Sequence, residues 1–329
     1  MTRMDRRQVI AGLAGSAALA GCASVPGAAP AGPAPRLYYL GQARVYMADP
    51  ETGEMATLVD QSPADGSRPQ GMINDGIAVH SATGQIFWTD MGRPAERDGT
   101  IMRCEKDGSG LTTVLAAGGA FTPKQLKIDE AAGKLYWSDR EGMAVKRCNL
   151  DGSEIETLVI TGNPVTDKGD ETRWCVGIAL DPGRGHVYWT QKGGDNASQG
   201  MIRRINMVMP RGSSATSRKD MLTLFARLPE PIDLDLDLGA RKIYWTDRGD
   251  NTISCAPLDR AGTYDPAVRV DREVLLSGLR EAIGIALDPP RNRMAFTSLG
   301  GEIGVAAMDG SQRRMLPSAP GMLTGICWA

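Results

Sequence analysis

One short motif recurs six times along this chain and limits what the chain can fold into. In its full form the motif is an aromatic pair followed by a hydroxylated residue and a carboxylate, and its copies begin 49 to 56 residues apart. A period of this length is typical of a propeller blade or another repeat unit. The six copies are Tyr38-Tyr39-Leu40-Gly41, Phe87-Trp88-Thr89-Asp90, Tyr136-Trp137-Ser138-Asp139, Tyr188-Trp189-Thr190-Gln191, Tyr244-Trp245-Thr246-Asp247 and Ala295-Phe296-Thr297-Ser298.

Each repeat has the same internal order of predicted strands. An apolar run ending in Asp precedes the aromatic strand, and a third strand, a turn and a fourth strand follow it, as in 126–129, 135–139, 145–150 and 156–160. Short runs rich in β-branched and aromatic residues, separated by Gly, Asp and Asn, indicate antiparallel strands. No segment after residue 35 shows sustained helical periodicity. We therefore predict an all-β protein, a six-bladed β-propeller of four-stranded antiparallel blades, whose closed ring leaves only short protected edges.

The two ends of the repeat region predict how the ring closes. The first repeat begins with its second strand, 37–40, because only a Pro-rich stretch precedes it. The segment 323–328 aligns with the inner strands 177–180 and 284–287, yet no aromatic strand follows it. We predict that this C-terminal strand completes the first blade and holds the ring closed.

Several longer segments resemble a known family. They are Thr122-Pro123-Lys124-Gln125-Leu126, Asp139-Arg140-Glu141-Gly142, Arg173-Trp174-Cys175-Val176-Gly177, Tyr188-Trp189-Thr190-Gln191-Lys192-Gly193, Leu228-Pro229-Glu230-Pro231-Ile232-Asp233 and Tyr244-Trp245-Thr246-Asp247-Arg248-Gly249. From residue 37 to 329 the chain resembles the low-density lipoprotein receptor class B (YWTD) repeat, and in particular a group of stand-alone bacterial and fungal YWTD propellers. The resemblance implies a six-bladed, TolB-like ring.

That group is often labelled as 3-hydroxyacyl-CoA dehydrogenase, and the residues here do not support the label. Dinucleotide binding needs a G-x-G-x-x-G turn that follows a strand and opens a helix within a βαβ unit. The sequence contains neither feature. We expect that the protein is not an NAD-dependent dehydrogenase.

The N-terminus is predicted to be a targeting segment rather than part of the fold. Arg6-Arg7 and the small apolar residues through Ala20 resemble a twin-arginine export signal, and Leu19-Ala20-Gly21-Cys22 matches a lipobox. This implies a signal peptide at 1–21, lipidation of Cys22, a flexible Ala/Pro/Gly linker at 22–35 and a propeller at 36–329. The mature protein would be exported to the periplasm or cell envelope and anchored to the lipid bilayer without a spanning helix. The alternative is soluble export with a chance match at Cys22.

Composition restricts the class of partner. The formal charge is −2 over 329 residues, with 42% hydrophobic residues, which allows one large core. Near-neutral charge without a basic block argues against a nucleic-acid partner. The five cysteines other than Cys22 show no C-x-x-C spacing, so we interpret them as small buried apolar residues rather than disulfides or metal ligands.

The aligned inner strands break a small-residue pattern in two repeats. The position before the apolar pair reads Gly76, Gln125, Gly177, Asp233, Gly284, Gly325, and the position two residues later reads Ala78, Lys127, Ala179, Asp235, Ala286, Cys327. Unpaired charge is costly to bury in a central channel. Two interpretations stay open: Gln125, Lys127, Asp233 and Asp235 either plug the channel as paired charges or form the floor of a ligand site.

A crescent of basic residues is predicted at one mouth of that channel. Arg140, Lys192 and Arg248 occupy the same position after three consecutive aromatic strands. Cationic groups beside an aromatic wall suit a small molecule with an anionic group. The alternative is that each base pairs with a motif carboxylate of a neighbouring blade, since Asp90, Asp139 and Asp247 are interpreted as structural. The predicted ligand-binding residues are Asp75, Lys124, Gln125, Arg140, Trp174, Lys192, Arg248 and Glu281.

We expect no resident cofactor and no metal. Oxygen ligands for Ca²⁺ at the channel mouth are present in Asn74, Asp75, Asp233 and Glu281, and this is the weaker alternative because neighbouring lysines disfavour a divalent cation.

Three functional hypotheses follow. The leading one is a lipid-anchored envelope propeller that binds a small anionic or polar aromatic ligand. The second is a non-redox lyase, isomerase or hydrolase that uses Lys127 with Asp233 or Asp235 as acid and base. The third is a scaffold for a protein partner, as receptor YWTD propellers are. The segment 163–172 is either a lid or a solvated loop.

Overall fold

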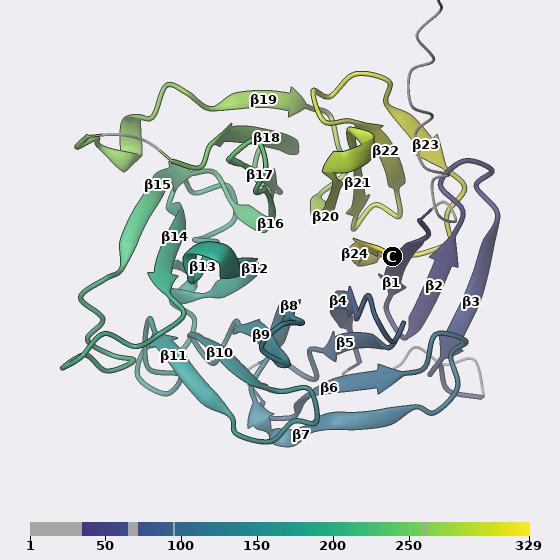
Figure 1. Ribbon diagram of the computed structural model, residues 1–329, viewed down its shortest axis with the longest axis horizontal. Helices are drawn as coiled ribbons and strands as arrows, with labels where there is room; N and C mark the ends of the chain where they lie inside the picture. The colour runs from purple at the N-terminus through teal and green to yellow at the C-terminus, as the bar shows by residue number, and fades with distance from the viewer. Residues whose placement is uncertain (1–34, 65–71, 95, 260–261) are drawn as a thin grey trace, which may run out of the picture. The chain divides into compact units, whose positions relative to one another are not determined.

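Six four-stranded sheets stand around a common axis in the computed structural model, which describes residues 35–64, 72–94, 96–259 and 262–329 (Figure 1). Every strand pairing in these residues is antiparallel, and the predicted six-bladed fold is confirmed. The predicted signal peptide, Cys22 and the linker up to residue 34 lie outside the described residues.

Each blade runs from an inner strand at the axis to an outer strand at the rim. Blade 1 consists of β24 (Leu323–Trp328), β1 (Leu37–Gly41), β2 (Arg44–Ala48) and β3 (Met55–Asp60). Blade 2 consists of β4 (Asn74–Val79), β5 (Ile86–Asp90), β6 (Gly99–Cys104) and β7 (Thr112–Ala120). Blade 3 consists of β8 (Pro123–Asp129), β9 (Lys134–Asp139), β10 (Ala144–Asn149) and β11 (Glu156–Ile160).

The second half of the ring repeats this order. Blade 4 consists of β12 (Cys175–Asp181), β13 (His186–Gln191), β14 (Gly200–Asn206) and β15 (Leu222–Leu228). Blade 5 consists of β16 (Pro231–Asp237), β17 (Lys242–Asp247), β18 (Thr252–Pro257) and β19 (Glu273–Leu276). Blade 6 consists of β20 (Ala282–Asp288), β21 (Arg293–Ser298), β22 (Ile303–Ala307) and β23 (Arg314–Leu316).

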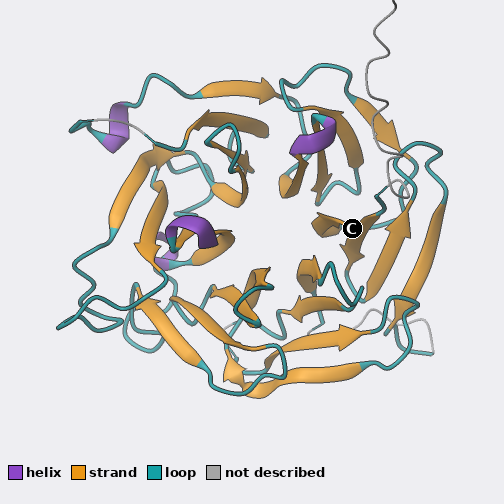
Figure 2. Cartoon of the chain, in the orientation of Figure 1, coloured by secondary structure: helices purple, strands orange, loops and turns teal. Residues whose placement is uncertain are grey.

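Helix is confined to short turns in the described part of the chain (Figure 2). These are the 3-10 helices η1 (Glu171–Arg173), η2 (Pro182–Arg184), η3 (Pro266–Val268) and η4 (Pro289–Arg291). Within the described residues, no helix has the length and apolar character needed to cross a membrane.

The two ends of the propeller close the ring in blade 1. β24 pairs antiparallel with β1, so that Leu37 lies opposite Trp328 and Tyr39 opposite Ile326. Arg36 and Ala329 exchange two further backbone hydrogen bonds of 2.6 and 3.0 Å. The predicted closure by the C-terminal strand is confirmed.

The aromatic pair of the motif forms the packing between blades. Successive residues of a strand point to opposite faces of the sheet, so the two rings of one motif contact different neighbours. Trp137 packs with Phe87 between blades 2 and 3, and Trp189 packs with Tyr136 between blades 3 and 4. These indole rings are fully buried, and aromatic side chains of this size carry a large share of core stability.

The hydroxyl of the motif connects neighbouring inner strands. Each inner strand has a register irregularity at the same place; β4, for example, pairs Asn74 with Asp90 and then Ile77 with Trp88. The N–H group of Gly76 at this bulge donates to Thr89 Oγ1 over 2.8 Å. Thr89 Oγ1 in turn donates to the carbonyl oxygen of Lys124 in blade 3 over 2.8 Å.

Equivalent bonds recur around the ring, and we call these six side chains the hydroxyl belt. In blade 1 the motif has Leu40 and no hydroxyl, and the bond comes from β24 instead, where Thr324 Oγ1 donates to Asn74 O over 2.7 Å. All six side chains are buried: Thr89, Ser138, Thr190, Thr246, Thr297 and Thr324.

The carboxylate of the motif fixes the loop that enters each inner strand. Asp139 accepts hydrogen bonds from the N–H groups of Thr122 (2.8 Å) and Gly142 (3.2 Å) and forms an ion pair with Lys146 (3.2 Å). Asp247 likewise accepts from the N–H group of Glu230 at 2.8 Å. The motif carboxylates are therefore structural, as the sequence indicated.

The described cysteines take part in no disulfide. Four are buried and one is partly buried, in agreement with the sequence interpretation: Cys104, Cys148, Cys175, Cys255 and Cys327.

Removing one hydroxyl of the belt should destabilise the whole ring. Thr190 Oγ1 accepts from Gly177 N at 2.7 Å and donates to Ile232 O at 2.6 Å, so Thr190→Val leaves two buried backbone groups unpaired. We expect a loss of about 2–4 kcal/mol in the free energy of unfolding, measured by urea denaturation. The matched control is Thr113→Val on the exposed face of β7, which should change stability by less than about 0.5 kcal/mol. Equal effects of the two substitutions would contradict a role for the belt.

Candidate functional site

The bulge in each inner strand aims one side chain at the channel mouth. These six residues lie one position before those aligned from the sequence, and we call them the mouth ring: Asp75, Lys124, Val176, Ile232, Ile283 and Thr324. All six line one pocket of about 400 Å³. Bulges commonly redirect a side chain beside a functional site. The three polar members come from blades 1 to 3 and the three apolar members from blades 4 to 6, so the floor is divided into two halves.

The apolar half of the mouth ring is a continuous surface. Val176, Ile232 and Ile283 are buried against one another, and Leu299 packs onto them. Met91 and Met322 extend the apolar lining of the pocket. This half can cover the hydrocarbon body of a small ligand.

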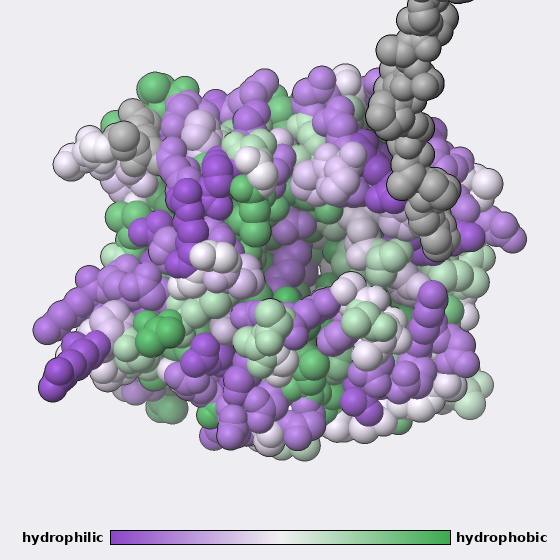
Figure 3. Space-filling view, viewed as in Figure 1, coloured by the Kyte–Doolittle hydropathy of each residue, from purple (hydrophilic) through white to green (hydrophobic). Residues whose placement is uncertain are grey.

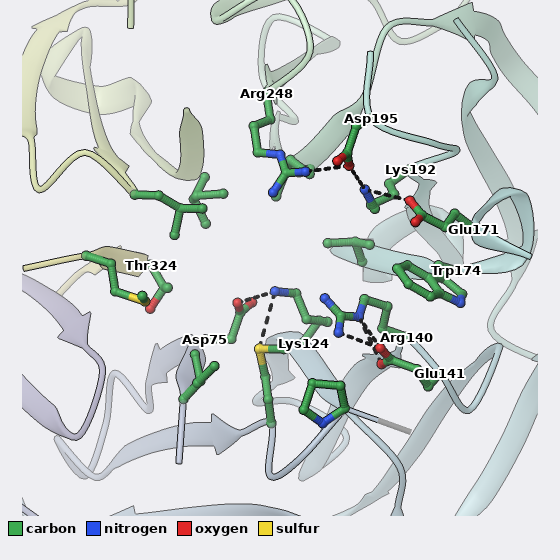
Figure 4. A pocket seen from close by; sticks show the side chains of 18 residues that line it. Asp75, Lys124, Arg140, Glu141, Glu171, Trp174, Lys192, Asp195, Arg248 and Thr324 are labelled. Carbon is green, nitrogen blue, oxygen red and sulfur yellow. Dashed lines mark hydrogen bonds and ion pairs between the residues drawn. The ribbon is translucent and has the colours of Figure 1, made fainter. Parts of the chain in front are cut away.

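The polar half holds a buried ion pair (Figure 4). Lys124 Nζ donates to Asp75 Oδ2, and Gln125 Nε2 donates to Asp75 Oδ1 over 3.1 Å. The Lys124 side chain is 10% exposed and that of Asp75 only 1%. Burial lowers the pKa of Lys124, although the charge of Asp75 opposes the shift. Lys124 is thus an amine whose charged form is disfavoured at the floor of a pocket.

Across the pocket, two cations share a group of carboxylates. Lys192 Nζ lies 2.7 Å from Glu230, 2.9 Å from Asp195 and 3.0 Å from Glu171. Arg248 Nη2 lies 2.6 Å from Glu230 and 2.7 Å from Asp195. Burial opposes the charge of Lys192, but the hydrogen bonds to its carboxylates prevail and raise its pKa.

Arg140 and Trp174 form the wall between these two groups. Arg140 Nε donates to both oxygens of Glu141 at 2.9 Å, and its guanidinium lies 4.8 Å from the Trp174 ring centroid. Lys192 Nζ lies 5.8 Å from the same ring. Trp174 therefore packs under two cations. The partners of the basic crescent are loop carboxylates, so the alternative of pairing with motif carboxylates is wrong.

The segment 163–172 is attached to the pocket wall. Glu171 O accepts from Gly193 N at 3.2 Å, and Trp174 O accepts from Lys192 N at 3.2 Å. Glu171 lines the pocket, while most of the preceding residues are exposed or half-buried. The segment supplies part of the wall, and its outer residues are solvated.

The charged residues of the inner strands lie apart from the pocket lining. Lys127 Nζ is 3.5 Å from Asp235 Oδ1, so the sequence correctly placed these two groups in a shared space. Asp233 Oδ2 accepts from Ile285 N at 3.2 Å and Asp235 Oδ2 accepts from Leu287 N at 3.0 Å, both on β20. These carboxylates satisfy edge N–H groups of the neighbouring blade, which favours the channel-plug interpretation.

The pKa values agree with a paired cluster. Burial raises the pKa of Asp233 to about 7. Burial opposes the charge of Lys127, but Asp235 and Asp233 outweigh it and raise the lysine pKa. The second hypothesis needs a lowered pKa at Lys127 for its role as acid and base. The raised pKa of this lysine does not fit that role.

Six of the eight predicted ligand-binding residues line the pocket: Asp75, Lys124, Arg140, Trp174, Lys192 and Arg248. Gln125 bonds Asp75 from outside the lining, and Glu281 is exposed and outside it. Sequence reasoning missed Val176, Ile232 and Ile283, although aligning the position before the inner-strand glycines would have found them. It also missed Asp195, whose loop shows no repeat signal.

The described residues offer no ready calcium site. They contain no group of three or more His, Cys, Asp and Glu arranged to hold a metal ion. Asp75, one of the four oxygen donors considered from the sequence, is already paired with Lys124.

Comparisons with known proteins support the same class. No family model matches the sequence. The chain is 38% identical over 295 residues to "Low-density lipoprotein receptor-related protein 1" of Pyricularia oryzae, covering 86% of this chain and 91% of that protein. It is 39% identical over 267 residues to "3-hydroxyacyl-CoA dehydrogenase-like protein LAM1" of Cochliobolus heterostrophus, covering 78% of this chain and 56% of that protein.

Solved structures share the fold at low sequence identity. The nidogen/laminin complex matches with a TM-score of 0.67 and 19% identity, covering 90% of this chain and 98% of that chain. TolB from Acinetobacter baumannii matches with a TM-score of 0.61 and 13% identity, covering 90% and 66%. A gluconolactonase from Xanthomonas campestris matches with a TM-score of 0.58 and 18% identity, covering 88% and 86%.

The fold and its repeats define a six-bladed β-propeller of the YWTD type. The chain belongs to the family of low-density lipoprotein receptor-related β-propellers. The dehydrogenase-like name belongs to the Cochliobolus protein; in the described residues here every strand pair is antiparallel and every helix has three residues, so no βαβ unit is present there.

The buried Asp233 predicts a pH-dependent stability. Its pKa is about 7 in the folded protein against 3.8 for an ordinary Asp, so its contribution to stability is full below about pH 4 and is lost as the pH rises through about 7. We expect the stability of the wild type relative to Asp233→Asn to fall over this range, measured by urea denaturation at each pH. The control is Asp107→Asn, because hydrogen bonds from Ser109 lower the pKa of Asp107 and confine its effect to acid pH. A constant offset between wild type and Asp233→Asn would contradict the assignment.

Proposed function

We propose that this propeller binds a small molecule with one anionic group and an apolar or aromatic body at the mouth ring. The observation that carries the proposal is the position of Asp195. Its carboxylate is seated between Lys192 and Arg248, yet its side chain is 76% exposed. It occupies the place in which a ligand carboxylate would be held.

Asp195 is the easier of the two shared carboxylates to displace, because its side chain is 76% exposed and can return to water, whereas Lys192 and Arg248 are only 7% and 24% exposed. Glu230, in contrast, is 2% exposed and stays as the fixed partner of both cations. An incoming carboxylate can therefore replace Asp195 while the two cations keep their positions.

The apolar half of the mouth ring determines the chemistry of the part of the ligand that carries no charge. Val176, Ile232 and Ile283 offer a surface without polar side-chain atoms beside the cations. Burial of apolar surface contributes about 25 cal/mol per Å², so a ring or short branched chain gains affinity there. A pocket of about 400 Å³ fits a molecule of the size of a substituted benzoate.

The proposal is tested with 4-methylbenzoate by isothermal titration calorimetry. We expect binding of the anion and no binding of 4-methylbenzamide, which has the same shape without the charge. Arg248→Gln should weaken binding by about tenfold or more, because it removes a charged hydrogen-bond donor. Asp195→Asn should strengthen it, because the competing charge is gone.

The matched control is Arg280→Gln, which removes an exposed arginine that is not part of the pocket lining. Its affinity should equal that of the wild type. Weakening by Arg280→Gln as large as that by Arg248→Gln would show that only the general surface charge is involved.

The location of this pocket is a second part of the proposal. The sequence around Cys22 supports an exported protein tethered to a bilayer by lipid, with residues 22–35 as the linker to the propeller. The pocket would then face a compartment of the cell envelope and sample small molecules there.

Anchoring is tested by expressing the full chain in a bacterial host with lipoprotein processing. We expect the wild type to partition into the detergent phase of a phase-separating detergent extract and Cys22→Ala into the aqueous phase. Aqueous partitioning of both proteins would contradict lipidation and favour soluble export. The control Cys104→Ala changes a buried propeller cysteine and should leave the partitioning unchanged.

A further inference from the structure

We infer that Lys124 is a carbonyl-reactive amine, so that the ligands of the pocket are small aldehydes or ketones that also carry a carboxylate. The inference rests on the proposed function, because the carboxylate is assigned to Lys192 and Arg248. It adds a reversible imine between the ligand carbonyl carbon and Lys124 Nζ.

The placement of the amine is the first argument. Lys124 and Lys192 are the two lysines among the described residues that line the pocket. Lys192 contacts three carboxylates, whereas the carboxylate bonded to Lys124 Nζ is that of Asp75. Figure 4 shows Lys124 and Asp75 across the pocket from Lys192, Asp195 and Arg248, with Trp174 and Arg140 at the side. A ligand anchored at the two cations would therefore present its far end to Lys124.

The state of the amine is the second argument. Imine formation needs an unprotonated amine, and burial of a lysine favours this form. Burial lowers the pKa of Lys124, the charge of Asp75 opposes this, and the charge of Arg140 adds to it. Met91 Sδ, 3.5 Å from Nζ, is a weak and neutral acceptor. Lys127, which the sequence suggested as an acid–base group, pairs with Asp235 and has a raised pKa.

Asp75 is placed to move the proton that the reaction requires. Its Oδ2 accepts from Lys124 Nζ, and Gln125 Nε2 holds its Oδ1 at 3.1 Å. The ammonium proton passes to Asp75, and the free amine forms a C–N bond to the carbonyl carbon. Proton transfers within the resulting carbinolamine place a proton on its oxygen, and Asp75 returns its own proton as the C–O bond breaks. The products are a protonated imine and one water molecule, so charge and atoms balance.

The rival interpretation is that Lys124 and Asp75 form only a structural ion pair. A purely structural ion pair has no need to face the pocket. Buried ion pairs also contribute little net stability compared with apolar residues in the same place. The lysine nevertheless lines the cavity rather than the interior between blades. Reactivity of the amine with a bound carbonyl separates the two interpretations directly.

The experiment uses 4-formylbenzoate with sodium cyanoborohydride at neutral pH. The reductant traps an imine as a secondary amine, which adds one ligand unit to the intact mass. We expect a single adduct that peptide mapping places on Lys124, and excess 4-methylbenzoate should suppress it. No adduct, or an adduct spread over exposed lysines such as Lys106, would overturn the inference.

The same ligands separate this inference from the proposed function. If 4-methylbenzoate binds and 4-formylbenzoate is not trapped, the imine is wrong and the binding function stands. If neither compound binds, the proposed function fails and the inference fails with it.

A variant pair completes the test. Lys124→Arg keeps a cation beside Asp75 but cannot form an imine, so the adduct should disappear. Lys134→Arg, which changes a lysine on β9 outside the pocket, should leave adduct formation unchanged. Far-ultraviolet circular dichroism checks that both variants fold. If Lys124→Arg does not fold, the peptide map of the wild type alone decides whether the adduct is on Lys124.

Discussion

The hydrogen bonds of the motif hydroxyl are the interaction on which the rest of the structure depends. The bulge leaves an N–H group that bonds a motif hydroxyl in four inner strands, at Gly76, Gly177, Asp233 and Gly284. A buried N–H group without a partner costs about 1–3 kcal/mol. A hydroxyl can accept one hydrogen bond and donate another, so Thr190 satisfies this N–H group and also contacts the next blade. The bulge, the mouth ring and the angular order of the blades therefore rest on the same side chains.

The fold was readable from the sequence because each of its determinants repeats. The aromatic pair marks every blade, and the period-2 alternation of a strand assigns its two rings to opposite interfaces. The first repeat lacks an inner strand, and the segment 323–328 is an inner strand without a repeat. Together these two observations predicted that 323–328 completes the first blade. No tertiary information beyond the repeat was needed for the architecture or the closure.

The site was readable only in part because the bulge shifts the register locally. The alternation of an inner strand places the residues aligned with Gly76 and Ala78 along the channel, and this reasoning selected Lys127, Asp233 and Asp235 as the site. The bulge in addition turns Asp75, Lys124 and their equivalents to the mouth, where the pocket lies. A shift of one residue exchanges the faces of a strand, and sequence periodicity does not report it. Loop carboxylates such as Asp195 escaped notice because loops carry no period.

The face of the ring seen in Figure 3 is hollowed at its centre and mixes hydrophilic with hydrophobic residues. The hydrophobic residues coloured in that view lie in small groups among hydrophilic ones. The pocket, in contrast, joins a compact apolar surface to cations whose charges are almost all matched by carboxylates. Matched charge favours selection of a ligand by the arrangement of its groups rather than by net attraction.

The hydroxyl of blade 1 comes from Thr324 on the C-terminal strand β24, and this has a consequence for biosynthesis. β24 and Thr324 are made after every other strand of the ring, while β1 is made first. Until they emerge from the ribosome, the nascent chain can form an open arc whose terminal blades expose unpaired edges, and such edges invite aggregation. The order of synthesis thus makes closure of the ring a late event. Until closure, only molecules that bind the nascent chain during translation can protect the exposed edges of the arc.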